Sequence, residues 1–128
     1  MLMLAATLIL AHAGCSKKVE VKSSITELEH SLSAPPPAQP QPNAPNPAAQ
    51  TEANGLIKSA LSAAQANDYA GSVIALQAAQ QKPGLTADQI ANAQHLKQAM
   101  VSDLQRRAVN GDQRALAQLK AIEKTRSQ

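Results

Sequence analysis

At 128 residues with 44% hydrophobic composition, the chain can form one small core, and that core is thin because alanine supplies much of the hydrophobic share. Aromatic residues make up only 1% of the chain, so helix propensity has to supply much of the stability. The formal net charge of +3 does not indicate binding to nucleic acid. Asp112 and Glu123 interrupt the basic residues near the C-terminus, and no aromatic side chain lies among them to stack on bases.

The chain opens with an apolar run over residues 1–14, which ends directly before its single cysteine, Cys15. As a helix this run would be about 21 Å long, too short to cross the roughly 30 Å of bilayer hydrocarbon. The polarity changes abruptly after Cys15 to Ser16 and two lysines. We therefore expect residues 1–14 to be an export signal peptide.

The segment Ala13-Gly14-Cys15 resembles the lipobox of bacterial lipoprotein signal peptides. The resemblance implies that the Cys15 thiol is alkylated by a diacylglycerol, that a peptidase cuts just before it, and that the new amino terminus is acylated, for example with palmitate. Cys15 is therefore the predicted lipidation site of a membrane-anchored cell-envelope protein that faces the periplasm. Ser16 stands where relatives retained in the inner membrane often carry aspartate, which favours the outer membrane. The alternative is an export segment, uncleaved or conventionally cleaved, with a free or buried thiol at Cys15.

Residues 15–50 are expected to form a tether, beginning with one short helix over residues 24–32. Ser24 and Glu27 resemble a capping box, and the apolar residues share one helical face. Those apolar residues are Ile25, Leu28 and Leu32. Two turns with three apolar anchors are not stable in water alone, so this helix would form only against the membrane, a partner or the domain.

Residues 34–50 are expected to be a disordered linker, because they hold seven of the chain's eight prolines. Such a composition is typical of a semi-rigid, polyproline-like spacer. A ligand for a proline-binding groove is the alternative, but no Lys or Arg flanks the prolines.

Residues 51–128 are expected to form a domain of four helices, at about 52–66, 69–81, 86–109 and 112–124. Asp68 and Asp112 are good N-caps, and Thr86 with Gln89 resembles a capping box. The residues expected to face inward recur at helical spacing: Leu56, Ile57, Ala60, Leu61, Ala64, Tyr69, Ala70, Val73, Ile74, Leu76, Ile90, Ala93, Leu96, Met100, Val101, Leu104, Leu116, Leu119 and Ile122. The turns are short, so the sequence predicts an all-α bundle of antiparallel helices, arranged as two stacked hairpins.

Residues 53–83 resemble one tetratricopeptide (TPR) repeat. The matching positions are Leu56, Ala60, Asn67, Asp68, Tyr69, Val73, Leu76, Ala79 and Pro83, with Leu56 in place of the usual aromatic residue and Ser72 in place of an alanine. Asn110-Gly111-Asp112 repeats the turn. The resemblance implies a TPR-like hairpin followed by a divergent one, and protein binding by analogy of fold.

No catalytic, cofactor or metal site is predicted. The three histidines, His12, His30 and His95, lie far apart and without cysteine or carboxylate at metal-ligand spacing. We also find no phosphate-binding loop or nucleophile elbow, so an enzyme with a small-molecule substrate is the weakest reading. The sequence favours a non-enzymatic, lipid-anchored envelope protein that presents a helical protein-binding domain. The alternative is a structural or spacer lipoprotein without a specific ligand.

Overall fold

A computed structural model describes residues 21–34 and 47–127, and every regular element within these two ranges is an α-helix. The helices are α1 (Val21–Ser33), α2 (Pro47–Gln65), α3 (Tyr69–Gln80), α4 (Ala87–Val109) and α5 (Gln113–Arg126). The predicted all-α class is confirmed. The predicted signal segment, Cys15 and most of the proline-rich linker lie outside the described residues.

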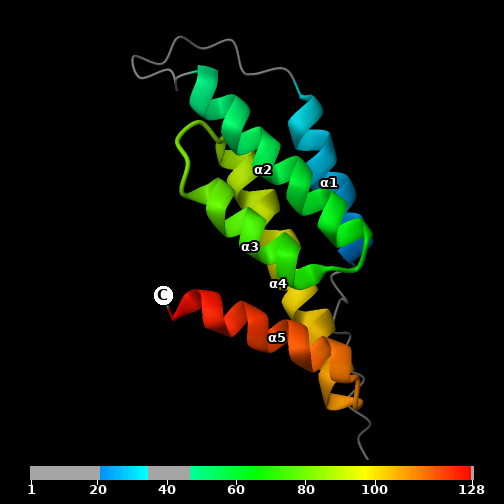
Figure 1. The fold of residues 1–128 in the computed structure, drawn as a ribbon. Coiled ribbons are helices and arrows are strands. Elements are labelled where there is room, and N and C mark those ends of the chain that lie inside the picture. Colours follow the sequence, from blue (N-terminus) through cyan, green and yellow to red (C-terminus); the bar gives the residue numbers. More distant parts are fainter. Residues whose placement is uncertain (1–20, 35–46, 128) are drawn as a thin grey trace, which may run out of the picture.

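The turn between α2 and α3 is built from Asn67 and Asp68, as the sequence predicts. Asn67 has a φ of 60°, in the left-handed region that asparagine tolerates. The backbone N–H of Asp68 donates to the carbonyl of Ala63 at 2.9 Å, which closes the end of α2. The Asp68 carboxylate then accepts from the backbone N–H of Gly71 and caps α3. The chain therefore reverses within a few residues, and α2 and α3 pack side by side (Figure 1).

The turn between α4 and α5 has the same construction. Gly111 has a φ of 90°, and the backbone N–H of Asp112 donates to the carbonyl of Arg107 at 3.0 Å. The Asp112 carboxylate accepts from the backbone N–H groups of Arg114 and Ala115, so the predicted cap is confirmed. The repeated turn therefore makes a second hairpin from α4 and α5.

The start of α4 also follows the prediction. The hydroxyl of Thr86 accepts from the backbone N–H of Gln89, and the Gln89 side chain accepts from the backbone N–H of Thr86. Figure 1 shows α4 running past the ends of α2 and α3, with α5 returning at an angle to them.

Helix α1 belongs to the bundle, which therefore has five helices where the sequence predicted four. It packs mainly against α4 and touches α2 (Figure 1). The sequence left open whether this helix forms against the membrane, a partner or the domain, and in the structure it packs on the domain. The predicted capping box is wrong, because α1 begins at Val21 and Ser24 is buried within the helix. Leu28 is fully buried and anchors α1 in the core.

The core consists of a few large aliphatic side chains separated by alanines. The largest fully buried apolar side chains are Leu28, Ile57, Val73, Leu76, Leu96, Met100 and Leu104. The buried alanines between them are Ala53, Ala60, Ala64, Ala70, Ala79, Ala93, Ala99 and Ala115. Tyr69 is buried as predicted. Small side chains allow the helix axes to approach closely, so this thin core still excludes water.

Three residues that the sequence predicted to face inward are instead exposed. Ile90 is 43% exposed, and Ile74 and Leu116 are each 38% exposed. Each lies one position after a buried residue, which places it about 100° further around its helix. At the starts of α4 and α5 the buried residue is the neighbour of the predicted one, Gln89 instead of Ile90 and Ala115 instead of Leu116.

We expect Leu28→Ala to release α1 while the other helices stay folded. Truncating a buried leucine costs about 2–5 kcal/mol, and a helix of this length has little stability of its own. Hydrogen exchange resolved by residue should therefore show protection lost across Val21–Ser33 and retained in α2, α3 and α4. Thr26→Ala, on the exposed side of α1, is the control and should leave protection nearly unchanged. Unchanged α1 protection in Leu28→Ala would contradict this account.

Candidate functional site

The one site residue that the sequence predicts, Cys15, lies outside the described residues. Within the described part of the chain, α3, α4 and α5 enclose a cleft of about 390 Å³. It is lined by Val73 and Gln77 of α3, by Lys97, Gln98, Val101 and Ser102 of α4, and by Ile122 and Arg126 of α5. On each helix the lining residues include pairs four positions apart, which face the same way.

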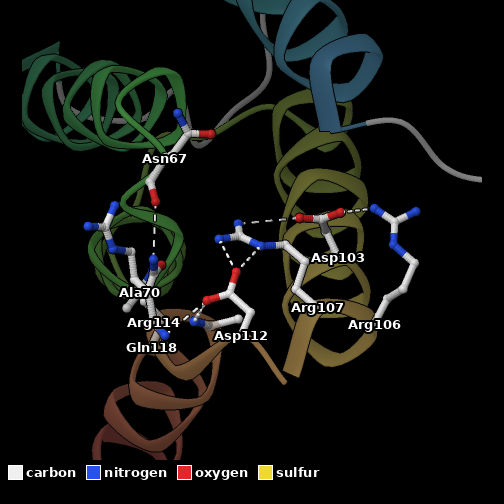
Figure 2. A network of polar contacts seen from close by, with 9 residues as sticks. Asn67, Ala70, Asp103, Arg106, Arg107, Asp112, Arg114 and Gln118 are labelled. Atoms are coloured by element: carbon white, nitrogen blue, oxygen red, sulfur yellow. Dashed lines mark hydrogen bonds and ion pairs between the residues drawn. The ribbon is translucent and has the colours of Figure 1, made fainter. Parts of the chain in front are cut away.

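The position of α5 is set by Gln118, whose amide bridges to the start of α3 (Figure 2). Its Oε1 accepts from the backbone N–H of Ala70 at 3.0 Å, and its Nε2 donates to the carbonyl of Asn67 at 3.2 Å. First-turn N–H groups have no partner inside their own helix, so Gln118 satisfies one that would otherwise need water. Ile122 and Arg126 follow one and two turns later on α5 and line the cleft.

A second polar network joins the end of α4 to the start of α5 (Figure 2). The Nε of Arg107 donates to Oδ2 of Asp112 at 2.8 Å, and the Nη2 of Arg107 lies 2.7 Å from the same oxygen. Asp103 pairs with Arg106 and lies 3.7 Å from Arg107. Backbone N–H donation from Ala115, together with the Arg107 guanidinium, lowers the pKa of the Asp112 carboxyl. These charges are mutually satisfied, so we assign the network to holding the α4–α5 turn.

Tyr69 lies beside this network and belongs to the core. Burial raises the pKa of its hydroxyl, and the nearby charge of Asp103 raises it further. The phenol is therefore neutral at physiological pH, as expected of a core tyrosine.

The cations of the cleft differ from those of the network, because neither makes an ion pair among the described residues. The Lys97 amine donates to Gln80 Oε1 at 3.3 Å, which is a neutral acceptor. Lys97 and Arg126 line the same cleft. Burial lowers the pKa of Lys97, and the positive charge of Arg126 lowers it further. The cleft therefore holds two like charges without a compensating carboxylate.

The lining residues suit binding. Val101 is partly exposed and offers apolar contact, and Ser102 and two glutamines offer hydrogen bonds. The lining contains no carboxylate, histidine or cysteine. What this arrangement can do chemically is hold an anionic group next to an apolar one.

The two described histidines, His30 and His95, are both exposed and lie on different helices. Across residues 21–34 and 47–127, no three metal-ligating side chains gather into a group that could hold a metal ion. Within the same ranges, no helix combines the length and the apolar character needed to cross a membrane.

The sequence did not predict the cleft. Lys97 with Val101, and Ile122 with Arg126, are each an apolar residue four positions from a cation, a pattern common on ordinary helix surfaces. Only the angle between α4 and α5 brings the two pairs together. No protein-family model, curated protein or solved structure matches the chain. Function is therefore inferred from its own residues.

We expect the stabilising effect of the Asp112 charge to disappear in acid. The pKa of Asp112 in the folded protein is below its ordinary value of 3.8, so its contribution is complete above that value. It is lost as the pH falls from 3.8 through the lower folded-state pKa. Asp112→Asn keeps the shape of the cap but not the charge. Its deficit in urea stability should be present at pH 7 and should shrink below pH 3.8; a deficit independent of pH would contradict this assignment.

Proposed function

We propose that this chain is a non-enzymatic, lipid-anchored protein of the cell envelope that presents a small helical domain to a protein partner. The observation that carries the proposal is the cleft between α3, α4 and α5, where apolar side chains and unpaired cations lie together. A domain that served only as a spacer would have no need for two uncompensated charges in a concave surface.

The hairpins support protein binding as the role of the domain. α2 with α3, and α4 with α5, are joined by turns of one construction, in keeping with a TPR-like hairpin followed by a divergent one. Ser72 stands where the TPR pattern has an alanine and is fully buried, so a small residue occupies the position. Stacked helical hairpins of the TPR kind are widely used to present binding surfaces.

The anchor is proposed from sequence alone. The lipobox-like Ala13-Gly14-Cys15 supports a lipid on Cys15, with the domain held in the periplasm by the proline-rich linker. Each buried methylene contributes about 0.8 kcal/mol, so two or three acyl chains hold a protein firmly to a membrane. Ser16 supports the outer membrane as the destination.

The anchor is tested by metabolic labelling with a clickable fatty acid. The wild-type chain should take up label and remain in the membrane fraction, whereas Cys15→Ser should take up none, because only the thiol can form the thioether. Ser16→Ala is the control and should be labelled like the wild type. Equal labelling of wild type and Cys15→Ser would overturn the proposed anchor.

Protein binding is tested by photo-crosslinking in living cells. A crosslinking amino acid placed at Gln98, in the cleft, should give one reproducible protein adduct. The same probe at Gln105, an exposed position further along α4, should not. Adducts absent at Gln98, at Gln105 and at Ile90 on the exposed side of α4 would contradict protein binding and favour a spacer.

A further inference from the structure

The two cations of the cleft, Lys97 and Arg126, have no carboxylate partner among the described residues and line one concave surface. Other cations without an ion pair, such as Lys58 and Lys120, lie on exposed helix surface outside the cleft. Bringing like charges together in a partly desolvated cleft costs free energy, as the lowered pKa of Lys97 reflects. An anion bound between them would remove that cost.

The rest of the lining defines what must accompany the anion. Val101 is the apolar lining residue that stays partly exposed, whereas Val73 and Ile122 are only 1% and 5% exposed. A small inorganic anion would leave the Val101 side chain in contact with water, whereas an apolar side chain next to the negative group would cover it. The ligand therefore needs a negatively charged group and an apolar group within a few ångströms of each other.

The remaining polar groups suit a polypeptide backbone. Gln77 of α3 and Gln98 of α4 both line the cleft, and each amide offers one acceptor and two donors. An extended backbone carries N–H and C=O groups on both edges, so it could bond to both amides. At about 390 Å³, the cleft has room for a few side chains of such a segment.

From these three features we infer that the cleft between α3, α4 and α5 binds an acidic peptide segment of a partner protein, in which a carboxylate side chain lies close to an aliphatic one. The inference rests on the proposed protein-binding function and names the chemistry of the partner. The carboxylate bonds to Lys97 and Arg126, and the aliphatic side chain packs on Val101.

The test uses fluorescence anisotropy with the full-length chain in detergent and a short labelled peptide in which glutamate alternates with leucine. The wild-type chain should bind this peptide, and binding should weaken with added salt. Two matched peptides should bind much more weakly. In one, glutamine replaces each glutamate, and in the other, serine replaces each leucine. The double variant Lys97→Gln with Arg126→Gln should lose at least about tenfold in affinity, because hydrogen bonds to charged groups are among the stronger ones.

The matched control is Lys58→Gln with Lys120→Gln, which removes the same charge from exposed positions outside the cleft. It should bind like the wild type. Equal losses in the two double variants would show general attraction to a basic surface and overturn the inference, as would equal affinity for the glutamate and glutamine peptides.

The two proposals fail in different ways. A protein adduct at Gln98 in cells, together with no affinity for the acidic peptide, would overturn this inference and leave protein binding in place. No adduct at any probed surface would overturn protein binding itself.

Discussion

The side-chain amide of Gln118 is the contact on which the shape of the candidate site depends. α5 is the last described helix, and Ala115 and Ile122 are its only buried residues, so apolar packing alone holds it weakly. Gln118 adds two hydrogen bonds to the backbone at the start of α3, each contributing about 1 kcal/mol. The Arg107–Asp112 pair fixes the N-terminus of α5. With its first half held at these two points, α5 crosses α3 and α4 at an angle and leaves a cleft beyond Gln118.

This arrangement explains why the charges of the domain fall into two groups. Near the α4–α5 turn, aspartates and arginines alternate and satisfy one another, so their role is to hold the helices. At the far end of α5, Arg126 lines the cleft together with Lys97 of α4, and the lining contains no carboxylate. Helices α4 and α5 supply both the paired charges at the turn and the cations Lys97 and Arg126 in the cleft. The way α5 packs on α4 therefore places these two cations in one cleft. A partner that brings a carboxylate would supply the cleft with the pairing that the aspartates supply at the α4–α5 turn.

The sequence predicted the local features of the fold well, because those depend on neighbouring residues. Asp68, Thr86 and Asp112 cap their helices as expected, since an N-cap needs only a short polar side chain and the next turn of backbone. The left-handed residues at the two hairpin turns, Asn67 and Gly111, follow the same local logic.

What the sequence could not predict depends on contacts between distant segments. The apolar face of α1 could pack against the membrane, a partner or the domain, and the residues of α1 alone do not determine which. Leu116 and Ile90 fit an apolar stripe by spacing, but the helices that would have covered them lie elsewhere. The cleft was missed for the same reason, because Gln118 and Asn67 are 51 residues apart and their contact has no signature in sequence.

The most direct test of this account is the exchange rate of one amide hydrogen. The N–H of Ala70 lies in the first turn of α3, where an amide has no partner within its helix and normally exchanges fast. Its partner here is Gln118 Oε1. We predict that the Ala70 amide is protected in the wild-type protein and loses that protection in Gln118→Ala, while amides in the middle of α2 keep theirs. Fast exchange at Ala70 in the wild type, or equal protection in both proteins, would contradict the docking of α5 on which the cleft depends.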